Sequence, residues 1–453
     1  MKTTVLAIDL DASSLPRRVL SLAWPVVAEQ TSYTFVGLVD TILVGHLGPA
    51  ALAGVGLAVQ TMWIPQVTFN GLAIGATAII ARRIGEGDPG RAREALHQSI
   101  LMAVLVGLIF APMIWVFAEP LMVLFRAQPD VVDVGVLYLR ASALGLTPAL
   151  IMVGANAAMR GAGNTRTPML IMIVANLVNV ILAYVLIYGF LGLPALGVVG
   201  SGIAASMAWT TGGVLAIILL VRGVGPLRYT YRRALSFSRQ TTGRILQVGL
   251  PAGLELLQFQ IAYTIFSVIF SALGTTVYAA HTVALRIENI AFMPGAALGM
   301  AATTLVGQAL GAGRPDLAQK AAKLAQWYAV GLMIAIGFLM FLFRSELMAI
   351  FVSDRAVIEM GALAMSIYSL SMPFMGIGNC LSGGLRGAGD TRAVLTIMTG
   401  SVWLVRLPFA YALAYWLGFG AVGAWSAAVL DITIRGSLLW WRFAAGHWKS
   451  IKV

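Results

Sequence analysis

The residues with the clearest chemical potential are two acids, Glu29 and Asp40, inside the apolar stretch from Leu22 to Gly48. They lie eleven residues apart, so in a helix with about 100° per residue they project from nearly the same face, roughly 16 Å from each other. Tyr33 fills a turn between them. A carboxylate inside an apolar span costs about 2.5–3.5 kcal/mol on insertion scales, so it indicates an ion pathway or a counter-ion site.

Other kinds of chemistry find no support in the sequence. The four histidines show no metal-ligand spacing, and the motifs HExxH, CxxC and GxSxG are missing. The glycine-rich turns GEGDP and GAGRP follow no predicted strand, so we do not expect them to bind a nucleotide. A single cysteine, Cys380, excludes an intramolecular disulfide. We therefore expect no enzymatic activity, no metal and no cofactor.

The composition is that of a polytopic membrane protein. Of the 453 residues, 59% are hydrophobic and 11% are charged, which argues against two or three soluble domains. Apolar segments of about 18 residues or more recur without the alternation of a membrane barrel, so the fold class is expected to be all-α. The first residues contain acids and a proline where a secretory signal would be apolar, so we expect no cleaved targeting segment.

Twelve candidate spans can be placed along the chain. They begin near Val19, Ala50, Ala95, Val131, Thr167, Ala195, Ile245, Val277, Ala321, Ala356, Val394 and Ala421. If the N-terminus is cytoplasmic, nearly all basic residues outside the spans fall in inside segments, and only Arg126, Arg344 and Arg355 fall in outside loops. This bias predicts that both termini are cytoplasmic. It also explains most of the formal charge of +12 without a nucleic-acid partner.

The chain contains an internal repeat whose constant offset superposes Pro25 on Pro251. The same shift superposes MRGAGNTR on LRGAGDTR and GEGDP on GAGRP. One constant offset indicates two copies of a six-span unit, and because six is even the copies have the same orientation. Such a parallel repeat predicts a pseudo-two-fold axis along the membrane normal and a cavity between two lobes.

The predicted organisation is an N-terminal six-helix lobe at 1–221, a basic cytoplasmic linker at 222–244 and a C-terminal six-helix lobe at 245–453. The linker contains six arginines and no acid. Two interpretations of it stay open, a plain positive-inside loop or a segment with an amphipathic part lying on anionic lipid.

The two copies differ in their acids. Glu29 corresponds to Glu255, which favours a shared architectural role, whereas Asp40 corresponds to Phe266. The acidic function is therefore expected in the N-terminal lobe alone. Among the other embedded charges, Asp431 is spaced i, i+4 from a basic residue, Arg435, and we expect these two to neutralise each other.

Three asparagines accompany the acids. Asn176 and Asn179 share a face of the fifth predicted span, and Asn156 lies near the cytoplasmic end of the fourth. An asparagine facing lipid is costly, so these side chains are expected to point into the lobe. There they either contribute to ion coupling or form plain hydrogen bonds between helices.

Several motifs together resemble one family. They are WPVVAEQ leading to VDTILVGHLG, RRIGEGD, LRGAGDTR with MRGAGNTR, and VALRIENIAFMPGAALGMAATTLVGQALGAG. The combination resembles the multidrug and toxic compound extrusion (MATE) family over essentially the whole chain, and within it prokaryotic members with an N-lobe cation site. The resemblance implies twelve transmembrane helices in two pseudo-symmetric six-helix bundles forming a V. It also implies export of organic cations or amphipathic compounds against an inward cation gradient.

The resemblance also implies a cation-coupling site. Asp40 matches the first-span aspartate thought to bind the coupling ion, Asn179 matches a fifth-span asparagine, and Asn156 matches one in the fourth span. The family often has a further aspartate four residues after the fifth-span asparagine, but this chain has Ala183 there. This departure favours a carboxylate that takes up a proton over a sodium site. The predicted cation-coupling set is Asp40, Asn179, Asn156, Tyr33 and Asn176.

We predict a secondary active antiporter that exports organic cations, drugs or amphipathic toxins in exchange for protons. It is expected to be a monomer among the lipids of the inner (plasma) membrane. Sodium coupling is the nearest alternative, followed by a lipid-precursor flippase and a non-transporting receptor. The candidates for a substrate cavity are Glu29, Glu255, Gln258, Phe259 and Met293.

Overall fold

The protein is built from helices. The computed structural model describes residues 12–190, 192–233 and 236–451, and the regular elements of these residues are helical. The chain forms two compact units. The N-terminal unit comprises Pro25–Ile84 and Asp88–Gly249, and the C-terminal unit comprises Met1–Trp24, Gly85–Gly87 and Leu250–Val453.

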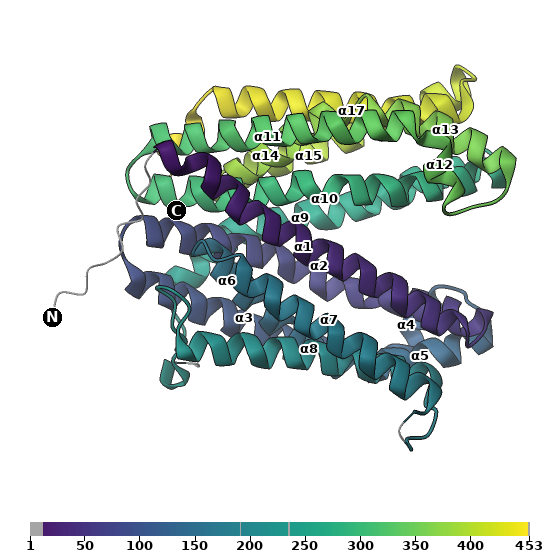
Figure 1. The fold of residues 1–453 in the computed structure, drawn as a ribbon, viewed down its shortest axis with the longest axis horizontal. Helices are drawn as coiled ribbons and strands as arrows, with labels where there is room; N and C mark the ends of the chain where they lie inside the picture. Colours follow the sequence, from purple (N-terminus) through teal and green to yellow (C-terminus); the bar gives the residue numbers. More distant parts are fainter. Residues whose placement is uncertain (1–11, 191, 234–235, 452–453) are drawn as a thin grey trace. The chain divides into compact units, whose positions relative to one another are not determined.

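In the N-terminal unit, α7 and α8 lie side by side, and α6 contacts both α3 and α8 (Figure 1). Helices α5 and α6 meet at a bend of 52°. The helices of this part of the chain are α1 (Leu15–Gly45), α2 (Pro49–Gly85), α3 (Pro89–Val116), α4 (Ala118–Leu124), α5 (Pro129–Ala143), α6 (Leu146–Gly161), α7 (Arg166–Tyr188) and α8 (Gly197–Arg222).

In the C-terminal unit, α14 contacts α10, α11 and α17, and α13 and α14 meet at a bend of 54°. The α-helices here are α9 (Arg239–Ser271), α10 (Thr275–Gly311), α11 (Pro315–Leu342), α12 (Arg344–Ala349), α13 (Arg355–Ser369), α14 (Met372–Ala388), α15 (Thr391–Ser401), α16 (Leu407–Tyr411) and α17 (Gly420–Ala444). The π-helical elements are η3 (Val402–Arg406) and η4 (Ala412–Trp416), and the 3-10 elements of the chain are η1 (Ala12–Ser14), η2 (Tyr231–Arg233) and η5 (His447–Ser450).

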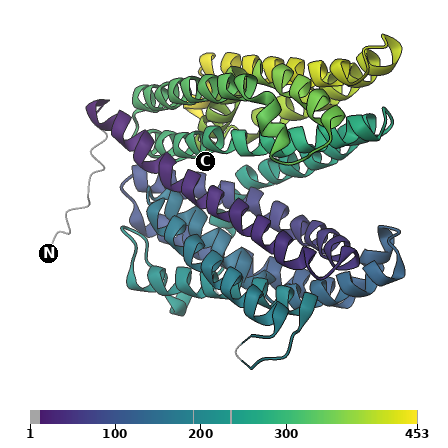
Figure 2. The same ribbon diagram turned by 45° about the vertical axis from the view of Figure 1, so that its right-hand side comes forward.

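Every predicted span falls on a helix or a bent helix pair. Within the described residues, nine helices are long and apolar enough to cross a membrane, and the pairs α5–α6 and α13–α14 raise the number to eleven. The remaining predicted span is α1, which Figure 2 shows as one long helix. It is 31 residues long but carries the polar run EQTSYT from Glu29 to Thr34 in its middle. The prediction of an all-α membrane protein is confirmed.

Helix α1 contributes to both units. Its first turns place Leu15, Val19 and Leu22 in an apolar core with residues of α10, α11 and α14. The change from one unit to the other falls at Pro25, and in α9 it falls next to Pro251. A proline inside a helix removes one backbone hydrogen bond. Both helices therefore have a weakened turn at the same position of the repeat.

The repeat extends to individual hydrogen bonds. The hydroxyl of Thr77 donates to the carbonyl oxygen of Ala157 at 3.0 Å. At the equivalent positions of the other copy, the hydroxyl of Thr303 donates to the carbonyl oxygen of Gly383 at 2.8 Å. These bonds join equivalent helix pairs, α2 with α6 and α10 with α14. The sequence repeat is therefore also a repeat of packing inside each unit.

One residue is inserted in the second copy. The hydroxyl of Tyr188 donates to the carbonyl oxygen of Leu43 at 2.9 Å, and that of Tyr415 donates to the carbonyl oxygen of Ile269 at 2.8 Å. The two acceptors are related by the offset of the repeat, but the same offset would superpose Tyr188 on Ala414, one position before Tyr415. The insertion falls in the span that contains η3, because a π-helical turn accommodates one more residue than an α-helical turn.

The glycine-rich turns have the conformation that their sequences predict. In GEGDP, Gly87 has φ = 72°, and in GAGRP, Gly313 has φ = 69°. This left-handed region is readily accessible to glycine. Pro89 and Pro315 then open α3 and α11, where a missing N–H costs nothing.

The described residues of the basic segment, 222–233 and 236–244, are folded against α3. Arg93 of α3 donates from Nε to the carbonyl oxygen of Pro226 at 3.0 Å. The side-chain amide of Gln98 donates to the carbonyl oxygen of Ser236 at 2.7 Å. Helix α9 already begins at Arg239, so the predicted linker includes the first turns of this helix.

Candidate cation site

The candidate cation site lies where α1 and α7 of the N-terminal unit meet. Asp40 is on α1, and Asn179, which is only 6% exposed, is on α7. In the amide orientation that satisfies both groups, Nδ2 of Asn179 donates to both carboxylate oxygens of Asp40, at 2.9 and 3.2 Å. The structure thus brings together the two residues that the sequence analysis placed first in its cation-coupling set.

A second polar contact between the same helices lies nearby in sequence. Nδ2 of Asn176 donates to the hydroxyl of Ser32 at 2.8 Å. Asn176 is buried. This bond satisfies the amide of Asn176 without Asp40, as expected for a plain bond between helices. The bond of Asn176 joins α7 to α1 next to the site, and a role of this residue in ion coupling stays a prediction.

Two tyrosines lie within electrostatic reach of Asp40. One is Tyr33, a predicted member of the set, and the other is Tyr138 of α5. Tyr138 is only 6% exposed, so its hydroxyl is held inside the unit. Tyr138 is not predictable as a site residue from the sequence, because a tyrosine on the apolar face of an amphipathic helix resembles an ordinary core residue. The one sequence signal for Tyr138 is that it places a hydroxyl group on the otherwise apolar face of α5.

Asn156 and Ala183 lie in different surroundings. Asn156 is 2% exposed, and its Oδ1 accepts no hydrogen bond from the described residues. No hydrogen bond between Asn156 and Asp40 is found in the described part of the chain. Ala183 is fully buried in an apolar cluster with Val44 and Ala204. Position 183 therefore supplies no side-chain oxygen to the site.

The other acid of α1 has a different partner. Glu29 forms an ion pair with Arg160 of α6, with 3.1 Å between Oε1 and Nη1. The equivalent pair in the C-terminal unit joins Glu255 to Arg386 at 2.5 Å. Both pairs are largely removed from solvent. The shared architectural role expected for these two glutamates is thus an ion pair that ties α1 to α6 and α9 to α14.

Within the described residues, no group of three or more histidine, cysteine, aspartate or glutamate side chains could hold a metal ion. The site consists of the carboxylate of Asp40, the amide of Asn179 and the hydroxyl groups of the two tyrosines. Such groups can bind and release a proton or a monovalent cation, and the tie between α1 and α7 would change with the state of the carboxylate.

Comparison with known proteins identifies the family. A model of the MatE family matches the chain twice, over residues 25–185 and 251–412. The chain belongs to the MatE family. The second match begins at the residue on which the repeat superposes the start of the first match, and it ends one residue after the position on which the repeat superposes the end of the first match. Both observations agree with a repeat that contains a single insertion. MatE proteins are membrane transporters and not enzymes.

Similar proteins cover nearly the whole chain. The multidrug resistance protein PmpM of Pseudomonas aeruginosa is 31% identical, over 94% of this chain and 91% of its own length. A probable multidrug resistance protein NorM of Thermotoga maritima is 29% identical, over 97% and 94%. A solved MATE transporter in an outward-facing conformation has a TM-score of 0.89 and 24% identity, over 96% and 97% of the two chains. The likeness to this structure supports the fold.

The C-terminal unit of this MatE protein contains a buried charge cluster that corrects one prediction. Asp431 does not take Arg435 as its direct partner. It pairs with Arg406, whose Nη2 and Nε lie 2.8 and 2.9 Å from Oδ2, and it also accepts a hydrogen bond from Ser401. The guanidinium of Arg435 lies over the ring of Phe259, 5.4 Å from its centroid. The helix spacing suggested the wrong partner because a bidentate bond from a neighbouring helix was available.

The remaining candidates for a substrate cavity belong to the C-terminal unit. Gln258 accepts a hydrogen bond from Nε1 of Trp403 at 2.8 Å. Phe259 lies beneath two guanidinium groups, those of Arg435 and Arg406. Met293 is half-buried on α10. Their role in substrate binding stays a prediction.

Proposed function

We propose that this protein is a proton-coupled antiporter that exports organic cations or amphipathic compounds, and that Asp40 carries the coupling proton. One observation carries the proposal. Glu29, Glu255 and Asp431 each pair with an arginine, but in the described residues Asp40 forms no ion pair. Its identified partner is the neutral amide of Asn179.

An acid without a cationic partner can change its charge without leaving a buried arginine uncompensated. When Asp40 is charged, the amide nitrogen of Asn179 donates to it. When Asp40 is protonated, its O–H becomes a donor, and only its carbonyl oxygen can still accept from the amide of Asn179. Protonation thus replaces a charge-assisted contact between the Asn179 nitrogen and both carboxylate oxygens by a weaker, neutral hydrogen bond between α1 and α7. This exchange is the step by which a proton would bias α1.

The substrate class follows from relatives and charge. PmpM and NorM are named as multidrug resistance proteins, and an anionic Asp40 would attract a cationic substrate that a neutral Asp40 releases. One charge crossing 100 mV is worth about 2.3 kcal/mol, and one pH unit is worth about 1.4 kcal/mol. The basic residues predict that both termini are cytoplasmic and that the protein lies in the plasma membrane.

Sodium coupling is the second candidate, and Asn156 favours it. Its buried Oδ1 accepts no hydrogen bond from the described residues, and a carbonyl oxygen of this kind can bind a cation. Ala183 argues against this alternative because it supplies no oxygen. A lipid-precursor flippase would need arginines available for pyrophosphate, whereas Arg160 and Arg386 are engaged by glutamates.

The test is transport in proteoliposomes with the substitution Asp40→Asn. Efflux of a fluorescent organic cation after a pH jump should fall to the level of protein-free vesicles. The matched control is Asp130→Asn at the exposed start of α5, which should transport like the wild type. A sodium jump at fixed pH distinguishes the two coupling ions. Wild-type efflux by Asp40→Asn after a pH jump would refute the proposal.

A further inference from the structure

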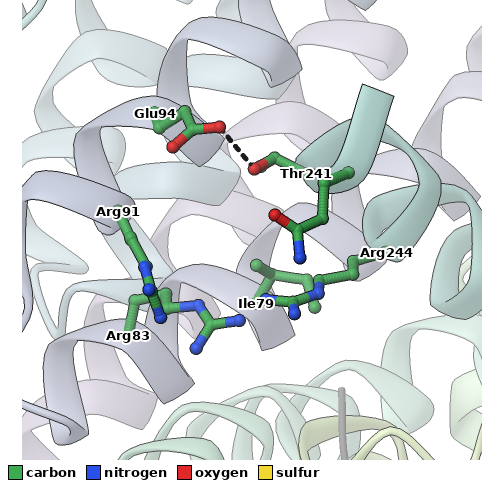
Figure 3. A pocket seen from close by; sticks show the side chains of 7 residues that line it. Ile79, Arg83, Arg91, Glu94, Thr241 and Arg244 are labelled. Carbon is green, nitrogen blue, oxygen red and sulfur yellow. Dashed lines mark hydrogen bonds between the residues drawn. The ribbon is translucent and has the colours of Figure 1, made fainter. Parts of the chain in front are cut away.

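A polar cavity of about 80 Å³ lies in the N-terminal unit, at the end that carries the basic segment. The end of α2, the first turns of α3 and the first turns of α9 enclose it (Figure 3). The residues that line it are Ile79, Arg83, Arg91, Glu94, Gln240, Thr241 and Arg244.

The lining has an excess of positive charge. It contains three guanidinium groups and one carboxylate, that of Glu94, which accepts a hydrogen bond from the hydroxyl of Thr241 at 2.6 Å. Outside the lining, Asp88 forms an ion pair with Arg91 at 3.5 Å. Among the lining residues themselves, three arginines stand against one acid, and Arg83 has a further interaction within the described residues. Arg244 makes no hydrogen bond or ion pair with the described residues. Like charges held around one cavity repel each other, so an anion between them would be stabilised.

The donors suit a phosphate group. Guanidinium groups present paired N–H donors that match the oxygens of phosphate. The first turn of α9, with Gln240 and Thr241, adds the positive end of a helix dipole. One water needs about 10–15 Å³ of such space, so the cavity can hold a small polyatomic anion. We propose that this cavity binds a phosphate group, supplied either by an anionic phospholipid headgroup or by free phosphate.

The repeat shows that the fold itself does not require these arginines. The turn between α2 and α3 aligns without a gap on the turn between α10 and α11. Arg83 corresponds there to Ala309, and Arg91 corresponds to Leu317. Both counterparts are apolar, although the helices end and begin at equivalent residues. The arginines therefore serve something that the N-terminal unit alone has.

The position of the cavity fits a ligand at the membrane surface. It lies at the ends of three helices that are long and apolar enough to span a membrane. Basic pockets between such helices on the cytoplasmic side are suited to acidic headgroups. An anion held there would join α2, α3 and α9, and binding to the folded state would stabilise it by mass action.

The experiment measures thermal unfolding of the purified full-length protein in a neutral detergent. One arm adds phosphatidylglycerol, with phosphatidylcholine as its control. The other arm adds inorganic phosphate, with chloride at equal ionic strength as its control. A saturable rise of the melting temperature is expected in at least one arm. A rise with phosphatidylglycerol alone identifies the lipid headgroup as the source, and a rise with phosphate identifies the free anion.

Variants separate a built site from general charge attraction. Arg91→Gln with Arg244→Gln should weaken the apparent affinity about tenfold or more, because charge-assisted bonds are lost. The matched control removes two exposed arginines of the basic segment, Arg228→Gln with Arg232→Gln, and should bind like the wild type.

A third variant should change the affinity for the anion in the opposite direction. Glu94→Gln keeps an acceptor for Thr241 but removes the negative charge, so it should bind the anion more tightly. A purely structural role for Glu94 would not produce this result. The proposal is overturned if the wild type shows no saturable response in either arm, if the control pair loses as much affinity as the cavity pair, or if Glu94→Gln weakens binding.

Discussion

The ion pair of Glu29 with Arg160 has an equivalent in the other unit, so the same prediction can be tested twice in one protein. Glu29→Gln removes the carboxylate that faces Arg160, and the side chains of this pair are only 10% and 13% exposed. Glu255→Gln makes the same change in the other unit, where the carboxylate side chain is 6% exposed and that of Arg386 is 19% exposed. Because the geometry repeats, we expect the two substitutions to have similar consequences.

The expected cost follows from burial. Removing one partner of a buried ion pair leaves the other charge uncompensated and costs about 3–5 kcal/mol. In a unit of roughly 200 residues, one kcal/mol corresponds to about 2–4 °C of melting temperature. Each glutamine variant should therefore melt about 6 °C or more below the wild type. The exposed pair of Arg355 and Glu359 is the control, because Glu359→Gln should cost about 1 kcal/mol or less.

Two measurements test this reasoning. Thermal unfolding in detergent should rank Glu29→Gln and Glu255→Gln together, well below Glu359→Gln. Transport in proteoliposomes, normalised to folded protein, should retain proton coupling in Glu29→Gln. A loss of coupling as complete as that of Asp40→Asn would place Glu29 in the ion pathway and refute the architectural role. Melting temperatures close to the wild type for both glutamine variants would refute the estimated cost.

Two further variants test the sites in each unit. Asn179→Leu removes the amide nitrogen that lies 2.9 and 3.2 Å from the two carboxylate oxygens of Asp40. Because a hydrogen bond to a charged group is worth about 1.5–3 kcal/mol, proton-driven efflux should fall tenfold or more; efflux at the wild-type rate would show that the amide is dispensable. Asp431→Asn leaves the buried guanidinium of Arg406 without its carboxylate, which should lower the free energy of unfolding by about 3–5 kcal/mol in a denaturant titration. Adding Arg406→Met should recover part of this stability. A double variant no more stable than Asp431→Asn would contradict this account.

The sequence predicted the fold well because the fold depends on local signals. Apolar segments gave the spans, and the turns GEGDP and GAGRP gave helix ends that Gly87 and Gly313 confirm through their positive φ. The π-helical elements η3 and η4 were not predicted. The turn of η3 accommodates one inserted residue, and a single insertion has no local sequence pattern.

The candidate site could be predicted only in part. Asp40 is predictable because a carboxylate inside an apolar span is energetically costly and so indicates function. Asn179 is predictable from the resemblance to the MATE family, but Tyr138 has no such signal. The partner of Asp431 was also missed, because Arg406 lies on a different helix, 25 residues earlier in the chain. An i, i+4 rule describes one helix and cannot rank partners from its neighbours. In the sequence, the arginines of the cavity cannot be told apart from ordinary positive-inside residues. Their grouping depends on the contacts between the basic segment and α3.

The two copies of the repeat carry side chains of opposite charge at the equivalent helix pair, an acid in the N-terminal unit and an arginine in the C-terminal unit. This difference makes the N-terminal copy the one suited to a cation. With the inserted residue counted, Asp40 corresponds to Phe266 and Asn179 corresponds to Arg406. In the C-terminal unit these counterparts also face each other, with the guanidinium 5.4 Å from the ring centroid. A fixed positive charge repels a proton or a metal cation, and this guanidinium is already neutralised by Asp431. The same helix pair therefore offers a carboxylate free of cationic partners in one unit and a permanently charged, satisfied arginine in the other. We therefore predict that the coupling site lies in the N-terminal unit.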